Sequence, residues 1–91
     1  MKIVTVCGMG FGTSLMLKMT IEDILKQNNI SDAQVDAWDL GSVKGRTADL
    51  FVASEDMKSN FTDIEGKIIF INNLTDEKEI KEKVLEAVKN I

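Results

Sequence analysis

The residues best suited to chemistry stand together near the start of the chain. Cys7 is the only cysteine, and three of the six glycines follow it at alternate positions: Gly8, Gly10 and Gly12. Glycine permits positive φ angles and close approach of the backbone, so the amide N–H groups of this stretch can converge on one oxyanion. These residue types at this spacing predict a nucleophilic thiolate beside a cradle for a phosphate-like group.

A strand and a helix are expected to position this cradle. Residues 3–6 are a short apolar, β-branched run, which is typical of a strand buried on both faces. After residue 13, apolar residues recur at the spacing of one helical face: Leu17, Ile21, Ile24 and Leu25. The unpaired N–H groups and the dipole of that helix favour a bound anion, and they favour the Cys7 thiolate over the thiol. Thr13 and Ser14 either donate hydroxyl groups to the anion or cap the helix.

The same patterns predict the rest of the chain. The first helix should end near residues 27–29, where asparagine tolerates a left-handed cap. Further elements are expected in this order: a strand over 33–38, a loop over 39–48, a strand over 49–53, a short helix after Ser54, a strand over 67–71, and a last helix with Thr75 as N-cap and Ile80, Val84, Val88 and Ile91 on one face.

This order of elements predicts a single α/β domain over residues 1–91. We expect a three-layer sandwich with a four-stranded parallel sheet in the order 2-1-3-4, joined by right-handed crossovers. The strand over 33–38 takes an edge because its residues alternate between apolar and mostly polar. Ligands of such sheets bind at the carboxyl ends of the strands. The side chains expected at that edge are Cys7, Asp39, Ser54, Asn72 and Asn73.

Several large apolar residues lie outside the predicted core stripes. Met16 and Met19 flank the buried face of the first helix, and we expect them to pack against the core. Met9, Phe11 and Leu15, near the glycine turn, leave two interpretations open: burial, or contact with a partner protein. Trp38, at the end of an edge strand, is expected to cover the core.

Composition removes many kinds of function. The net charge of −4 argues against nucleic acid, whose binding depends on clustered Lys and Arg. The chain has no histidine and one cysteine, so neither a zinc site nor an internal disulfide is expected, and no metal or cofactor is predicted. The first apolar run is too short for a signal peptide or a membrane span, and we therefore expect a cytoplasmic protein.

Three known glycine or cysteine loops differ from this one in residue spacing or in the residue at position 13. A mononucleotide P-loop needs one more residue between its glycines and a Lys where Thr13 stands. A dinucleotide loop needs a third glycine at the same position. The low-molecular-weight phosphatase pattern C-x5-R-[ST] fits in spacing and at Ser14, but Thr13 replaces its Arg. Without that guanidinium, hydrolysis of a phosphocysteine should be slow, so the loop is suited to holding phosphate and passing it on.

Residues 7–19, after a four-residue strand, resemble the IIB components of the bacterial phosphoenolpyruvate-dependent sugar phosphotransferase system. The likeness is closest to the ascorbate type, with the galactitol and lactose types next. It implies a cytoplasmic carrier that takes phosphoryl from a phosphohistidine of a IIA protein and gives it to a sugar entering through the membrane component IIC. The carrier would contact the membrane only through IIC. Cys7 would be the phosphorylated nucleophile, with this phosphate-binding loop: Gly8, Met9, Gly10, Phe11, Gly12, Thr13 and Ser14.

Two other kinds of function stay open at this point. One is a phosphatase-like hydrolase or an arsenate reductase. The missing Arg at position 13 and the missing second cysteine argue against it. The other is a regulatory module that binds phosphate without transferring it. The resemblance assigns no role to Lys18, Asp39 or Asn73.

Overall fold

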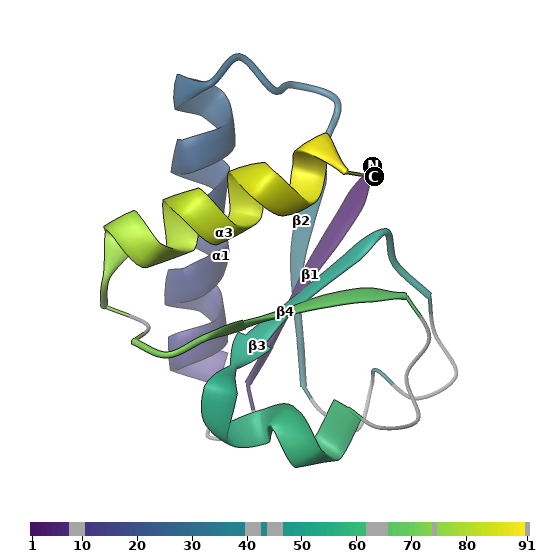
Figure 1. The fold of residues 1–91 in the computed structure, drawn as a ribbon. Coiled ribbons are helices and arrows are strands. Elements are labelled where there is room, and N and C mark those ends of the chain that lie inside the picture. The colour runs from purple at the N-terminus through teal and green to yellow at the C-terminus, as the bar shows by residue number, and fades with distance from the viewer. Residues whose placement is uncertain (8–10, 40–42, 44–46, 62–65, 74, 91) are drawn as a thin grey trace.

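The computed structural model describes residues 1–7, 11–39, 43, 47–61, 66–73 and 75–90 of the 91-residue chain (Figure 1). Its elements are, in chain order, β1 (Lys2–Cys7), α1 (Phe11–Gln27), β2 (Gln34–Asp39), β3 (Leu50–Ser54), the 3₁₀ helix η1 (Glu55–Phe61), β4 (Lys67–Ile71) and α3 (Glu77–Lys89). Among these residues no helix is long and apolar enough to cross a membrane.

The four strands form one parallel sheet in the order β2-β1-β3-β4, which confirms the predicted topology. The amphipathic strand β2 lies at an edge, as its alternating pattern indicated. The register pairs Cys7 with Asp39 and Ser54 with Ile71, so the carboxyl ends of neighbouring strands lie together. β1, which ends at Cys7, has a hydrogen-bonded strand on each side.

Two hydrophobic clusters cover the two faces of the sheet. On one face, α1 packs on β1 and β2, α3 packs on β4, and the two helices contact each other. The buried residues of this first cluster include Ile3, Leu17, Ile21, Leu50, Val52, Ile71, Ile80 and Val84. The second cluster, on the other face, consists of Val4, Val6, Val43, Phe51, Ala53 and Met57. Helices on one face and η1 with Val43 on the other give the three layers that the element order predicted.

Trp38 covers the second cluster, as expected. Its side chain is half-buried against that cluster, and Lys2 Nζ lies 4.7 Å from the centroid of its ring.

Of the predicted loop over residues 39–48, Val43 is helical and fully buried. Residues 40–42 and 44–46, which include Lys44 and Arg46, are outside the described part.

The first helix begins two residues earlier than predicted, at Phe11 instead of near Thr13. A first turn makes few demands on its residues, because its N–H groups have no partner within the helix, so Gly12 is tolerated there. The other end agrees with the prediction. Asn29 follows α1 with a φ of 60°, and the Ile30 N–H donates to the Leu25 carbonyl at 2.9 Å. This is the left-handed termination that asparagine allows.

Met16 and Met19 do not pack against the core, so that prediction was wrong. They are 45% and 59% exposed, whereas Leu17 and Ile21 are almost fully buried. At about 100° of rotation per residue, both methionines point to the side of α1 opposite the buried stripe. They flank the stripe in sequence but not around the helix.

The N-cap of α3 is Asp76, and the prediction of Thr75 was wrong. Asp76 has extended backbone angles, and its Oδ1 accepts the N–H groups of Lys78 at 3.2 Å and Glu79 at 3.3 Å. A carboxylate at this position also complements the helix dipole. The Thr75 hydroxyl instead donates to Asn73 Oδ1 at 2.7 Å.

The buried face of α3 differs from the prediction at its third residue, by one position along the chain. Ile80 and Val84 are buried as expected, but Ala87 is the third buried residue, and Val88 is half-buried against the first cluster. A strict spacing of four drifts around a helix of 3.6 residues per turn, which brings the i+7 position inward. Ile91 lies outside the described part.

Short turns connect β3 and β4. Ser54 is the last residue of β3, and the segment after it is a 3₁₀ helix. Gly66, before β4, has a φ of 117°, a conformation that favours glycine, and a Cβ there would lie 3.7 Å from Cε2 of Phe51.

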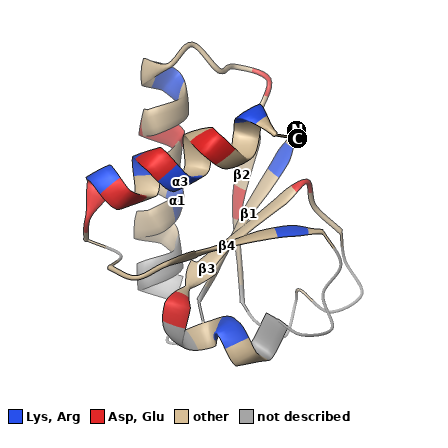
Figure 2. Ribbon diagram, viewed as in Figure 1, with Lys and Arg blue, Asp and Glu red and all other residues tan. Residues whose placement is uncertain are grey.

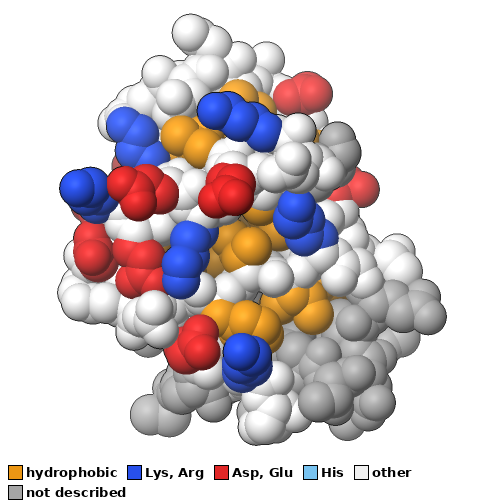
Figure 3. All heavy atoms as spheres, viewed as in Figure 1, with side chains coloured by type: hydrophobic (Ala, Val, Ile, Leu, Met, Phe, Trp, Pro, Cys, Tyr) orange, Lys and Arg blue, Asp and Glu red, His pale blue; other side chains and the backbone are white. Residues whose placement is uncertain are grey.

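A groove of about 380 Å³ runs between β4 and α3, lined by Glu55, Lys67, Ile69, Phe70, Lys83, Glu86, Ala87 and Asn90. Figure 3 shows apolar side chains on this face, ringed by charges of both signs. Charged residues around an edge strand oppose unwanted pairing with another chain.

Candidate active site

The central strand β1 carries Cys7 to the carboxyl edge of the sheet. Ile3, Val4 and Val6 are buried on alternate faces of that strand, so its position is fixed by both hydrophobic clusters. Only residues 8–10 separate the end of β1 from the start of α1. A connection this short keeps the first turn of the helix close to Cys7.

The structure divides the predicted phosphate-binding loop into two parts. Gly8, Met9 and Gly10 lie outside the described residues. The backbone of Phe11, Gly12, Thr13 and Ser14 forms the first turn of α1. The structure does not describe their side chains or that of Cys7, so their contacts with phosphate stay predictions.

The two long helices differ in what their N-termini offer to an anion. The first turn of α3 is occupied by its own carboxylates, with Asp76 as N-cap and Glu77 and Glu79 following. The first turn of α1 contains no acidic residue, and the sequence has none between Cys7 and Glu22. The positive end of the α1 dipole, next to Cys7, is therefore not neutralised by an acidic side chain of that turn.

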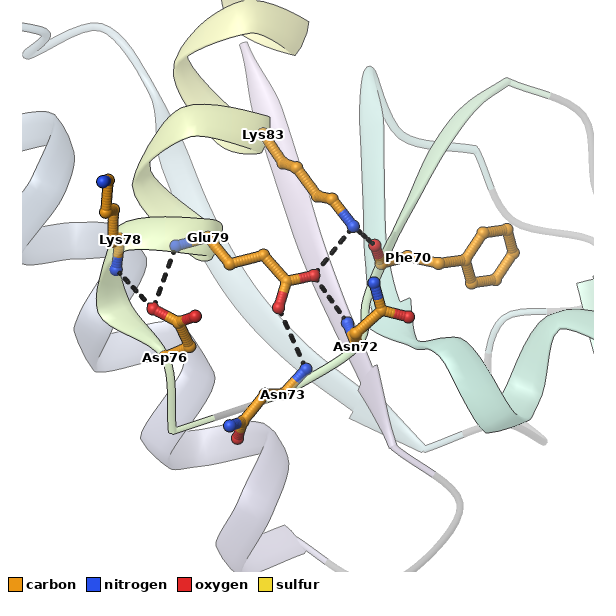
Figure 4. A network of polar contacts seen from close by, with 7 residues as sticks. All are labelled: Phe70, Asn72, Asn73, Asp76, Lys78, Glu79 and Lys83. Atoms are coloured by element: carbon orange, nitrogen blue, oxygen red, sulfur yellow. Dashed lines mark hydrogen bonds and ion pairs between the residues drawn. The ribbon is translucent and has the colours of Figure 1, made fainter.

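A network of polar contacts holds the loop that follows β4 at the same edge of the sheet (Figure 4). Glu79 Oε2 accepts the Asn72 N–H at 2.7 Å, and Oε1 accepts the Asn73 N–H at 3.0 Å. Lys83 Nζ donates to Glu79 Oε2 at 2.8 Å and to the Phe70 carbonyl at 2.7 Å. One carboxylate of α3 thus fixes two successive backbone amides at the end of β4.

This arrangement lowers the pKa of Glu79 from its ordinary 4.5 to about 2. The largest cause is the hydrogen bond from Lys83, followed by that from the Asn72 N–H. Partial burial opposes them, and the Asn73 N–H and the charge of Lys83 lower the pKa further. Glu79 had no part in the site predicted from the sequence. The spacing of four between Glu79 and Lys83 was the available signal for their pairing.

Comparison with known proteins decides the family. A family model described as "PTS system, Lactose/Cellobiose specific IIB subunit" matches residues 2–86. The chain belongs to the IIB subunits of the phosphotransferase system. It is a phosphotransferase subunit that carries phosphoryl groups, and IIB subunits work in a system with IIA and IIC components.

Curated relatives of this IIB subunit cover nearly its whole length. One from Mycoplasma pneumoniae, named an ascorbate-specific EIIB component, is 36% identical over 94% of this chain and 93% of its own length. Components of the same name from Escherichia coli O157:H7 and Salmonella typhi are each 31% identical over 97% of this chain and 89% of theirs. The resemblance found in residues 7–19 is thereby confirmed at the level of the family.

The stability of this IIB subunit should depend on pH through Glu79. Because its pKa is lower in the folded chain than in the unfolded one, the carboxylate stabilises the fold fully above about pH 4.5. That contribution should be lost as the pH falls from 4.5 towards 2. Glu79→Gln should therefore lower the stability in urea at pH 7, and its difference from the unchanged protein should vanish near pH 2.

The matched control is Glu82→Gln, on an exposed residue of the same helix. Its stability should follow that of the unchanged protein at pH 7. An equal loss of stability for the two variants at pH 7, or a Glu79→Gln difference that persists at pH 2, would contradict the role given to this network.

Proposed function

We propose that Cys7 is the phosphoryl carrier of this IIB subunit and that the chain works in the cytoplasm between two partners. The Cys7 thiolate attacks the phosphorus of a phosphohistidine on IIA, a sulfur–phosphorus bond forms, and the phosphorus–nitrogen bond breaks with its electron pair returning to the imidazole. A hydroxyl of the sugar carried by the membrane component IIC then attacks the same phosphorus and releases its proton to solvent. The thiolate leaves and is ready for another cycle.

One observation carries this proposal: Cys7 ends the central strand, and only three residues separate it from a helix whose first turn contains no acidic residue. Amides there can stabilise the charge on the equatorial oxygens during transfer. The residues proposed to surround the phosphoryl group are Gly8, Met9, Gly10, Phe11, Gly12, Thr13 and Ser14. The chain has no histidine, so the donor imidazole must belong to another protein.

The proposed sugar is L-ascorbate. The curated relatives that match nearly the whole chain are named ascorbate-specific, while the description of the family model names lactose and cellobiose. Both kinds of match span nearly the whole chain, but individual relatives that are 31–36% identical are a more specific guide to the sugar than a model of a whole family. A galactitol-type or lactose-type substrate is the alternative that the experiment must separate.

The test uses the purified chain, a phosphorylated ascorbate-type IIA protein, and membranes that contain an ascorbate-type IIC. Mass spectrometry should find one phosphoryl group on the peptide that contains Cys7, stable to alkali and labile to iodine. Adding the membranes with L-ascorbate should remove it and yield phosphorylated sugar, whereas galactitol or lactose should not. No phosphoryl group on Cys7 would overturn the carrier role, and discharge by galactitol or lactose alone would overturn the sugar.

A further inference from the structure

A row of polar residues crosses the carboxyl edge of the sheet at Cys7. On one side the register pairs Cys7 with Asp39 of β2. On the other side, β1 and β3 are paired as far as Val6 and Ala53. One residue later the two strands end, at Cys7 and Ser54. Adjacent strands of a sheet lie about 4.8 Å apart, so Ser54 is the direct neighbour of Cys7 on β3.

Ser54 and position 7 share the face of the sheet that α1 covers. Side chains alternate along a strand, so every second position of β3 faces the same way as Ser54. Those positions are Leu50 and Val52, which belong to the first cluster, together with residues of α1. In β1 that cluster takes Ile3, and the same alternation puts position 7 on its side. The Ser54 hydroxyl therefore lies on the same side of the sheet as the helix that begins after Cys7.

Ser54 differs from the rest of its strand. The other four residues of β3 are apolar and buried, whereas Ser54 is half-buried. A serine hydroxyl has one proton to donate and two lone pairs that accept. The strand thus brings one side-chain hydrogen-bond donor to the position beside Cys7.

The other neighbours of Cys7 along this edge supply no such donor. Asp39 is acidic, and Ile71, which pairs with Ser54 on β4, is apolar. Figure 2 shows the uncharged ribbon of β3 followed by an acidic position where η1 begins, which is Glu55. Carboxylates accept hydrogen bonds without donating them, and their charge opposes a second negative charge nearby. A thiolate at this edge therefore needs stabilisation from a group other than these side chains.

We infer that Ser54 is a catalytic residue of the transfer, whose hydroxyl donates a hydrogen bond to the sulfur of Cys7. This inference rests on the proposed function. A hydrogen bond to a charged acceptor is roughly twice as strong as one between neutral groups, so it stabilises the thiolate more than the thiol or the phosphorylated sulfur. It favours the nucleophile before the attack on phosphohistidine. It favours the same thiolate as the leaving group when the sulfur–phosphorus bond breaks.

A purely structural role for Ser54 is the alternative. Serine is a good N-cap, and η1 begins at the next residue. A cap acts on the stability of the fold, whereas a hydrogen bond to the thiolate acts on the protonation of Cys7. The two roles are therefore separated by how Cys7 reacts at different pH values.

The test measures the rate at which iodoacetamide alkylates Cys7 as a function of pH. Cys7 is the only cysteine, so the rate reports on it alone. In Ser54→Ala the midpoint of this profile should rise by about one pH unit, because a hydrogen bond to a charged group contributes roughly a factor of ten. The rate at high pH, where every thiol is ionised, should not fall. At neutral pH, kcat for transfer from phosphorylated IIA should fall about tenfold, with KM unchanged.

A matched pair of variants isolates the hydroxyl. Ser54→Thr and Ser54→Val give side chains of nearly the same shape, both suited to a strand, but only threonine keeps the donor. Ser54→Thr should retain the original pH profile and transfer rate, whereas Ser54→Val should behave like Ser54→Ala. Ser59→Ala removes the same oxygen from an exposed residue of η1 and should change neither measurement.

Each other outcome has a defined meaning. If the unchanged chain accepts no phosphoryl group at Cys7, the proposed function itself fails, whatever the alkylation profiles show. If Ser54→Ala lowers the stability followed by Trp38 fluorescence but leaves the profile unchanged, Ser54 is only a cap and the inference is overturned. Equal shifts in Ser54→Thr and Ser54→Val would overturn it as well, since the hydroxyl would then be irrelevant. A shifted profile with a normal transfer rate would exclude the catalytic role.

Discussion

Replacing Cys7 with serine should abolish phosphoryl transfer to sugar, lowering its rate by more than about 10³-fold while the chain stays folded. A serine hydroxyl is un-ionised at neutral pH and is a far weaker nucleophile than a thiolate. Once phosphorylated, serine would also be a poor leaving group, so the second step would stop even if the first took place. The measurement is the formation of sugar phosphate with phosphorylated IIA and IIC membranes.

The control for this variant is Ser59→Ala, a change of one oxygen at an exposed residue of η1. It should leave the rate unchanged. Because Cys7 is the only cysteine, loss of alkylation by iodoacetamide verifies the replacement directly. Sugar phosphorylation by Cys7→Ser at a substantial fraction of the original rate would disprove the carrier role.

The sheet could be predicted because each strand has a recognisable pattern of apolar and polar residues. Residues 3–6 are apolar except for Thr5, and residues 50–53 are a continuous apolar run; the structure buries both in the central strands β1 and β3. The alternating residues of β2 placed it at an edge, and the order of elements then left one arrangement consistent with right-handed crossovers. Sequence patterns of this kind report burial, and burial determines where a strand lies in a sheet.

The errors arose where two neighbouring residues could play the same part. Thr75 and Asp76 are both good N-caps, and the choice depends on which residue takes extended backbone angles. In the structure Asn73 Oδ1 accepts both the N–H and the hydroxyl of Thr75, which leaves Asp76 as the cap. Met16 and Met19 were misplaced because the prediction used their hydrophobic character and not their angle around the helix, at about 100° per residue, from the buried stripe.

The candidate site was predictable in its position more than in its contacts. Chain order alone placed Cys7 at the carboxyl end of a central strand, and the register confirms that placement. The Glu79 network was not foreseen, since a carboxylate that binds two backbone amides depends on how α3 is set against the end of β4. The role of Cys7 and of its loop stays a prediction.

The N-termini of α1 and α3 show one physical principle used in two ways. Both have N–H groups without a partner inside the helix, near the carboxyl edge of the sheet. In α3 the chain supplies its own anion, because Asp76 caps the helix. In α1 the first turn carries no acid, which suits an anion that arrives and leaves. Placing the permanent carboxylates on α3 keeps the loop after β4 fixed without competing for the phosphoryl group.

Truncating Phe51 to alanine should destabilise the domain by about 3–5 kcal/mol, through lost burial and the cavity left behind. Phe51 is fully buried and is among the largest residues of the second cluster, where it lies beside Val4 of β1 and Ile68 of β4. For a domain of this size the melting temperature should fall by roughly 15–30 °C. Trp38 is the only tryptophan and packs against the same cluster, so its fluorescence should report the unfolding.

Phe51→Leu is the matched control, because leucine keeps most of the buried volume and should lose much less stability. At a temperature where Trp38 fluorescence shows Phe51→Ala to be folded, IIA should phosphorylate Cys7 at nearly the normal rate. Phe51 packs against β1, the strand that ends at Cys7, on the face of the sheet opposite α1. Its truncation should therefore change the rate of phosphoryl transfer only by changing the fraction of folded protein. A variant that is folded by this measure and yet slow in transfer would show that the second cluster also shapes the site.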